Sequence, residues 1–134
     1  MNKHFKISVI KTEFFTDLEN KSVTCKVYYK IKTSDRKLKH VVNNIGLFVD
    51  GYMRIGETYT AEATAKTYED DVFVQRAGEQ VARAKAESAA YNVVSRYFKR
   101  VNNWYLNNID STIFKFEDKS NGVIEHNDRY IESF

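Results

Sequence analysis

Apolar residues recur at two different spacings along this chain: two residues apart in the first half, and three or four apart in the second. The first spacing runs through residues 5–11, 23–31 and 57–66, and it predicts three β-strands. The polar residues 17–22 predict a turn between the first two strands. The third strand alternates polar residues with small ones, so we expect its small side to face a helix; its small residues are Ala61, Ala63 and Ala65.

The second spacing predicts one long helix over residues 70–106, in a chain without proline. The small early positions of its apolar face let another backbone approach, and the bulky later positions extend past the sheet towards another helix or another subunit. A break near Tyr91 and Asn92 would divide the helix in two, and we favour a single helix. The predicted face consists of Gly78, Ala82, Ala86, Ala89, Val93, Tyr97, Val101 and Trp104.

The remaining segments are harder to assign. Residues 33–39 are expected to form a charged loop, and Asp50-Gly51 either closes a hairpin between residues 46–49 and 52–55 or lies in an irregular segment. Asn107-Asn108 and Asp110-Ser111 predict the end of the long helix. Beyond it, Asn121-Gly122 favours either a hairpin or an extended arm on a neighbouring subunit.

These elements predict an α+β protein with an N-terminal antiparallel sheet packed against one long C-terminal helix. We expect a single domain, 1–134, divided into a sheet (1–66), the helix (70–106) and a short tail (107–134). A length of 134 residues with 43% apolar content is sufficient for one core. The bulky end of the helix has little sheet to cover it, so a homo-oligomer, a dimer or larger, is expected.

Charge is unevenly distributed. The chain carries +3 in total, with +6 in residues 1–40, no net charge in residues 41–109, and −3 from Asp110 onward. The basic start either attracts an anionic partner or serves solubility. The single Cys25 rules out an internal disulfide and suits a reducing compartment. Without a signal-peptide pattern or an apolar run of ~20 residues, a cytoplasmic protein with no membrane partner is expected.

Catalytic patterns are scarce. The three histidines are scattered, no metal-ligand spacing is present, and neither a glycine-rich phosphate loop nor a Gly-x-Ser-x-Gly elbow occurs. Cys25 as a nucleophile would need a distant histidine, so a buried hydrophobe is favoured. The acidic residues 69–71 suit a helix cap better than a cation site. We therefore expect a protein that is not an enzyme and has no cofactor, metal ion or catalytic residue.

The long helix does carry groups that bind nucleotides. Arginine offers a planar fork for phosphate, aromatic rings stack on bases, and asparagine can read a base edge. The same groups also suit an ordinary solvated helix face, and Phe73 suits the core. The candidate ligand-binding residues are Phe73, Arg76, Arg83, Tyr91, Asn92 and Arg96.

Residues 57–91 resemble a strand-then-helix unit of small bacteriophage proteins, with an Asp71-Val72-Phe73 step before an alanine-rich helix that starts at Gly78. This unit is similar to the phage-encoded Thoeris anti-defence sponge family; the residues after Ser111 depart from it. The resemblance implies a homo-oligomer in the host cell cytoplasm that inhibits antiviral signalling by sequestering cyclic ADP-ribose-type signals without cleaving them. It also implies arginine, asparagine and aromatic contacts near a subunit interface.

The residues bear on three other functions. A double-stranded-RNA-binding domain fits poorly, because the acidic residues 69–71 stand where such a domain carries lysines. A phage protein that binds single-stranded DNA or RNA would use the lysine-rich strands and exposed aromatic rings. An inhibitor of a host protein would use the aromatic end of the helix and the tail. Sequestration of a small cyclic nucleotide is the function we expect, with nucleic-acid binding as the alternative.

Overall fold

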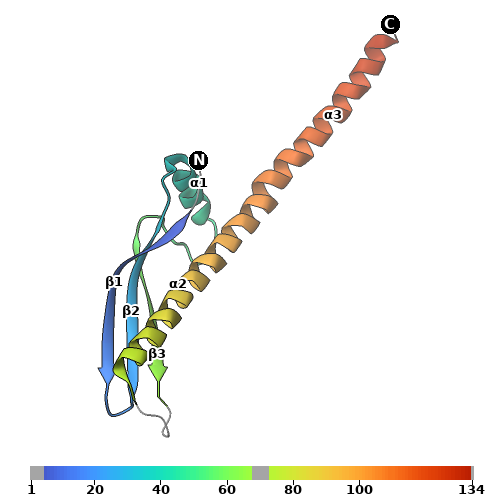
Figure 1. Ribbon diagram of the computed structural model, residues 1–134. Coiled ribbons are helices and arrows are strands. Elements are labelled where there is room, and N and C mark those ends of the chain that lie inside the picture. Colours follow the sequence, from blue (N-terminus) through green and yellow to red (C-terminus); the bar gives the residue numbers. More distant parts are fainter. Residues whose placement is uncertain (1–4, 68–72, 134) are drawn as a thin grey trace.

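The computed structural model describes residues 5–67 and 73–133. The described part of the chain forms one sheet, a long helix across it with a helical extension, and a separate short helix (Figure 1). This arrangement confirms the predicted α+β class with its N-terminal antiparallel sheet and long C-terminal helix. The elements are β1 (Lys6–Asp17), β2 (Ser22–Lys32), α1 (Arg36–Gly46), β3 (Thr58–Lys66), α2 (Gln75–Tyr105), the π-helical turn η1 (Leu106–Asp110) and α3 (Ser111–Glu132).

The three strands form an antiparallel sheet in the order β1-β2-β3, so β2 is central. The predicted turn joins the first two strands, where the Asp17 carboxylate accepts hydrogen bonds from the backbone and side-chain nitrogens of Asn20 at 3.2 and 2.7 Å. Every second residue of β2 is buried, as its alternation predicts; these residues are Val23, Cys25, Val27, Tyr29 and Ile31. Burial raises the pKa of the Cys25 thiol, which agrees with its interpretation as a small core residue.

Helix α2 packs on β2 and β3 through its small residues. A Cβ atom added to Gly78 would lie 2.9 Å from a methyl group of Val23, so the helix backbone at Gly78 lies directly against that side chain of the sheet. One detail of the predicted face was wrong: Ala90 and Val94 are buried, whereas Val93 is exposed and Ala89 only half-buried. Residues three and four positions apart both lie on one face of a helix. The sequence alone did not show which of the two spacings follows Ala86, so it did not separate Ala89 and Val93 from Ala90 and Val94.

The segment after α1 and the helix itself cover the end of the core around the buried Tyr97, which we call the wide end of the core. The prediction of a charged loop over residues 33–39 was wrong, because α1 begins at Arg36. Of the two alternatives for residues 46–55, the hairpin is absent and the irregular segment is confirmed, since no strand or helix lies between α1 and β3. Asp35 caps this helix, accepting a hydrogen bond from the Leu38 backbone nitrogen at 2.9 Å. Gly46 lies directly against the hydroxyl group of the buried Tyr97, so only a residue without a side chain fits there.

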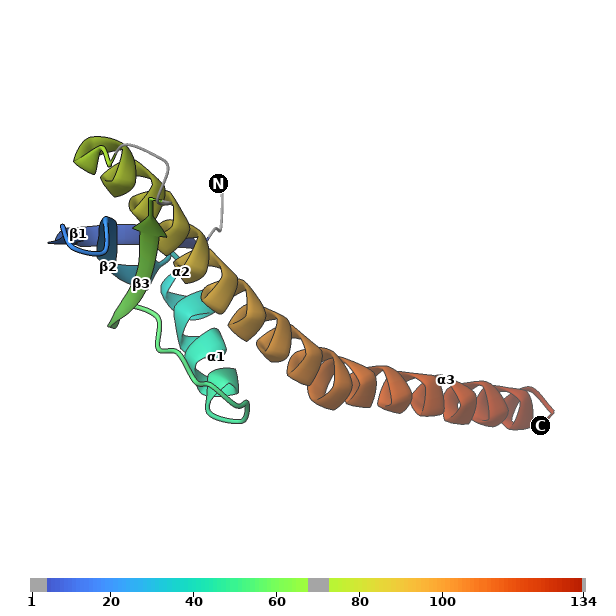
Figure 2. The same cartoon turned by 90° about the horizontal axis from the view of Figure 1, so that it is seen from below.

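The predicted tail was also wrong. The long helix continues from α2 through η1 into α3, although Asn107, Asn108 and Gly122 had indicated an end and a hairpin. Side chains satisfy backbone carbonyls at the π turn: Asn108 donates to the Trp104 oxygen at 2.9 Å, and Thr112 donates to the Asn108 oxygen at 2.8 Å. The favoured single helix is confirmed through Tyr91 and Asn92, where the alternative break is absent, and the bend lies where α2 meets α3 (Figure 2).

The start of the helix at Gln75 is later than residue 70, and the acidic residues 69–71 lie outside the described residues. Across 5–67 and 73–133, no helix combines the length and the hydropathy needed to cross a bilayer.

Candidate functional site

The six predicted ligand residues lie in separate places along α2. Phe73 precedes the helix and packs against the core, as the alternative interpretation of this residue held. Arg76 and Arg83 line a shallow groove of about 210 Å³ beside the ring of Phe14 on β1. The Arg83 guanidinium donates to the Glu87 carboxylate at 3.2 Å, which offsets part of its charge. This first groove therefore offers two guanidinium groups and one ring, beside the Glu79 carboxylate and the Gln80 amide.

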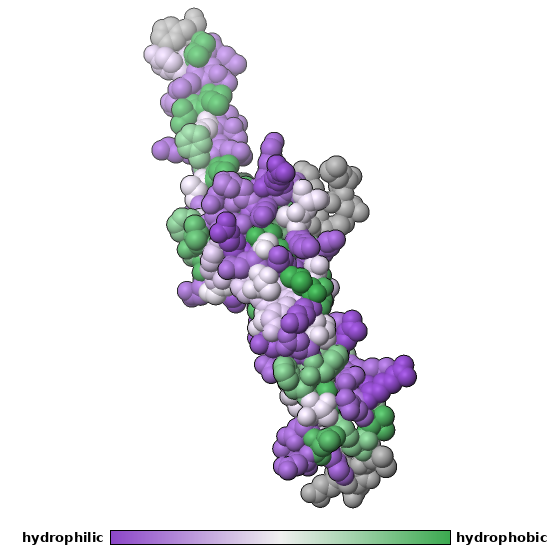
Figure 3. All heavy atoms as spheres, turned by 90° about the vertical axis from the view of Figure 1, so that its left-hand side faces the viewer, coloured by the Kyte–Doolittle hydropathy of each residue, from purple (hydrophilic) through white to green (hydrophobic). Residues whose placement is uncertain are grey.

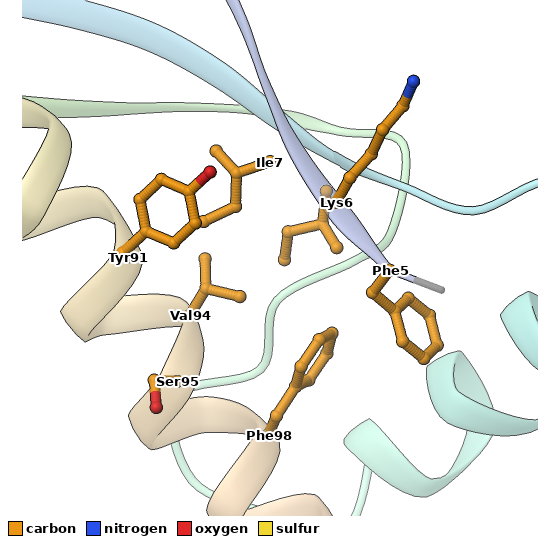
Figure 4. Close-up of a pocket in the computed structure, with 8 residues that line it drawn as sticks. Phe5, Lys6, Ile7, Tyr91, Val94, Ser95 and Phe98 are labelled. Atoms are coloured by element: carbon orange, nitrogen blue, oxygen red, sulfur yellow. The ribbon is translucent and has the colours of Figure 1, made fainter. Parts of the chain in front are cut away.

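Tyr91 belongs to a different and larger groove of about 620 Å³, between the start of β1 and the middle of α2 (Figure 4). Its walls are mostly apolar: the Phe5 and Phe98 rings lie 4.8 Å apart between centroids, and Ile7 and Tyr91 point towards one another. The Lys6 ammonium group extends away from the groove. This groove suits an apolar group and offers little to hold a pyrophosphate.

Asn92 and Arg96 are exposed on another side of α2. At about 100° per residue, they point roughly 100° and 140° away from Tyr91 around the helix axis. A single copy of the chain therefore does not bring the six residues into one site. The sequence predicted residue types that bind nucleotides, but their distribution around the helix separates them.

The outer face of the sheet also gathers cations. Because alternate strand residues face opposite sides and the odd-numbered residues of β2 are buried, its even-numbered residues point outward. Three rows of neighbours cross this face where β1 begins: Lys6 pairs with Lys32, Ser8 with Lys30 and Thr58, and Lys11 with Tyr28 and Thr60. None of these eight positions is acidic. We call them the lysine platform.

A β-bulge places Lys11 on this platform. The pairing of β1 with β2 shifts between Val9 and Lys11, which leaves Ile10 as the extra residue. Without the bulge, Lys11 would face α2 together with Ile7 and Val9. The bulge turns the following part of β1 over, and the Lys11 ammonium then lies 5.5 Å from the centroid of the Tyr28 ring.

Acidic residues begin in the next row, which pairs Glu13, Lys26 and Glu62. The Lys11 ammonium group lies 2.7 Å from a carboxylate oxygen of Glu13 and donates a hydrogen bond to it. This hydrogen bond lowers the pKa of the Glu13 carboxyl and raises that of Lys11, so both groups stay charged at neutral pH. The Lys26 ammonium lies 5.3 Å from the centroid of the Tyr28 ring, so that ring has cation–π contacts with both Lys11 and Lys26.

The sequence indicated only part of this site. The alternation in β2 predicted that Lys26, Tyr28 and Lys30 share one side, and the charge of +6 over residues 1–40 indicated an anionic partner as one possibility. The bulge and the hydroxyl groups of β3 depend on strand pairing, which has no local signal in the sequence. Among the described residues, no group of three His, Cys, Asp or Glu side chains is placed to hold a metal ion.

No protein-family model matches the chain, and the comparisons with curated proteins and with solved structures give no match either. The functional argument therefore depends on the geometry described above.

Proposed function

We propose that this chain is a non-enzymatic binding protein that holds single-stranded nucleic acid on the lysine platform. One observation carries the proposal: four lysines surround an outward-facing tyrosine and three hydroxyl groups, on a half of the sheet face that includes no acidic residue. Ammonium groups attract the phosphate backbone, and a tyrosine ring accepts a stacked base.

The shape of the platform favours single strands over duplexes. Its side chains project from one face of the sheet, with neighbouring strands about 4.8 Å apart. A flexible strand can follow such a face while it turns one base onto Tyr28. A rigid duplex would present its phosphates but shield its bases, so it would gain no stacking energy. The free energy of binding is therefore expected to come from both charge and stacking.

Fluorescence anisotropy with labelled single-stranded oligonucleotides over a range of salt concentrations tests the proposal. Each phosphate contact on a single strand contributes about −0.7 to the slope of log K against log salt. Glu13 offsets part of the charge of Lys11, so the four lysines predict a slope between about −2 and −3. Replacing Lys30 and Lys32 by alanine is expected to reduce the slope by about 1.4. Tyr28→Ala is expected to cost about 1–3 kcal/mol of binding free energy.

The matched control removes two lysines away from the platform and off the apolar face of the helix, Lys99 on α2 and Lys115 on α3, both of which are exposed. This variant has the same net charge as the platform variant, and we expect it to keep the full slope. Equal losses in the two variants would show that binding follows net charge alone. A chain that does not bind at low salt would also contradict the proposal.

Sequestration of a small cyclic nucleotide, the function that the resemblance implies, is a second proposal. It is favoured by the position of Arg76 and Arg83, which line the same groove beside Phe14. Two guanidinium groups match a pyrophosphate, and the ring suits a base. Calorimetry with cyclic ADP-ribose isomers tests it: we expect heat that disappears when both arginines become alanine and persists in the exposed control Arg129→Ala. No heat with any isomer would end this proposal.

A further inference from the structure

Helix α3 carries an apolar face that its own chain leaves exposed. None of its residues is buried, and in Figure 3 hydrophobic side chains recur along the projecting end of the molecule. The positions along the middle of this face follow one another at alternating intervals of three and four residues, which is the spacing of a coiled coil. We call these positions the α3 seam: Ile113, Phe116, Ser120, Val123, Asn127 and Tyr130.

The π turn aligns the α3 seam with the core. On a regular helix the seam would lie roughly 100° around the axis from the face of α2 that is buried on the sheet. The turn η1 takes up about one additional residue and so removes this offset. The apolar face of the long helix therefore continues in one line, from the sheet through the half-buried Trp104, which stacks on Phe48 with ring centroids 5.0 Å apart, and onward along α3.

We propose that two copies of this chain associate in parallel through the α3 seam. The polar residues of the seam favour a second copy of this chain as the partner, and a parallel orientation of the two helices. In a parallel pair each seam residue meets its own equivalent, so Ser120 faces Ser120 and Asn127 faces Asn127, and both pairs can form hydrogen bonds. An antiparallel pair in the best overlapping register would place Asn127 against Phe116 and leave the buried amide without a partner.

Charge agrees with this arrangement. In a parallel pair the positions that flank the seam bring Lys119 next to Ile124, and Thr112 next to Glu117, of the other helix. Neither contact opposes like charges. Two other acidic residues of α3, Asp118 and Glu125, lie on the far side of the helix from the seam and stay in water.

The area is sufficient for a stable pair. Six large apolar side chains of α3 on or beside the seam are each more than half exposed. If each loses on the order of 100 Å², two copies together bury about 1,200 Å², which is at the lower end of stable interfaces. These side chains are Ile113, Phe116, Val123, Ile124, Tyr130 and Ile131.

Two neighbouring phenylalanines give a matched test on the full chain. Phe116 on the seam is 70% exposed, and Phe114 is 67% exposed but points roughly 200° away from it. Sedimentation equilibrium is expected to show a dimer for the unmodified chain and for Phe114→Glu. Phe116→Glu is expected to raise the dissociation constant about 100-fold. Circular dichroism at the same concentrations verifies that each variant is folded.

The direction of the pair is tested by oxidation. In a Cys25→Ala background, Ser120→Cys is expected to form a disulfide between copies, and Asn121→Cys, one residue off the seam, is not. A chain that stays monomeric at all concentrations overturns the proposal, and so does equal weakening by the two glutamate variants. Efficient cross-linking through residue 121 but not residue 120 overturns the parallel arrangement.

Discussion

The two parts of the long helix differ in what surrounds them. Helix α2 buries six residues, and its small face packs on a sheet whose central strand is buried at every second position. Helix α3 buries none, although its apolar residues are as regularly spaced. Because the stability of most helices comes from tertiary packing, α2 is stabilised within one chain whereas α3 needs an occupant for its face. The core between α2 and the sheet is therefore complete within one chain, whereas the apolar face of α3 is covered only when a second copy binds.

The largest expected effect concerns the close contact between α2 and the sheet. Ala86 is fully buried, so Ala86→Leu forces three additional carbon atoms into a filled space. We expect it to lower the free energy of unfolding by about 3 kcal/mol in a denaturant titration. The exposed Ala84→Leu, two residues away, is expected to change it by less than about 0.5 kcal/mol. Similar values for both variants would contradict the close packing of α2.

The second prediction joins the α3 seam to the lysine platform. A parallel pair carries two platforms, so a long single strand that reaches both is expected to bind about 100-fold more tightly than a short one that fills only one. Phe116→Glu is expected to remove most of this advantage without changing the affinity for the short strand. Anisotropy titrations with both lengths measure the ratio. A ratio that is unaffected by Phe116→Glu would show that assembly and binding are independent.

The third prediction concerns the wide end of the core, where α1 meets α2. The buried Tyr97 hydroxyl lies against Gly46 and near the Met53 backbone amide, but it makes no hydrogen bond of ordinary geometry. Gly46→Ala is expected to cost about 2 kcal/mol of stability, because its methyl group and that hydroxyl need the same space.

Removal of the hydroxyl supplies the control for that site. We expect Tyr97→Phe alone to leave stability unchanged or to raise it by about 1 kcal/mol, since it removes a buried polar group without a partner. Added to Gly46→Ala, it is expected to recover about half of the loss. Additive effects in this double-mutant cycle would show that the two residues do not compete for space.

Local patterns in the sequence predicted the parts of the fold that depend on local chemistry. Alternation located the three strands and the buried side of β2, and the small residues of the helix indicated its close contact with the sheet. The end of the helix was mispredicted because Asn107, Asn108 and Gly122 are residues that commonly stop helices. The regular spacing of Ile113, Phe116 and Val123 in the same segment carried the opposite signal, and the structure follows that spacing.

The candidate site was less predictable, for geometrical reasons. Arg76, Tyr91 and Arg96 are the right residue types for a nucleotide, but they point in different directions around α2. The lysine platform assembles from three strands whose relative register is not local, and Lys11 joins it only through a bulge. A sequence reports which groups are available, whereas pairing and rotation decide which of them meet.

Hydrogen exchange of the full chain at a series of protein concentrations tests most directly the claim that α2 is stable by itself and α3 is not. The account predicts slow exchange of the backbone amides in residues 82–101 at every concentration, because their protection comes from packing within one chain. It predicts that amides in residues 113–130 exchange rapidly in dilute solution and become protected as the concentration rises. Rapid exchange of residues 113–130 at all concentrations, or protection that does not change on dilution, would contradict it.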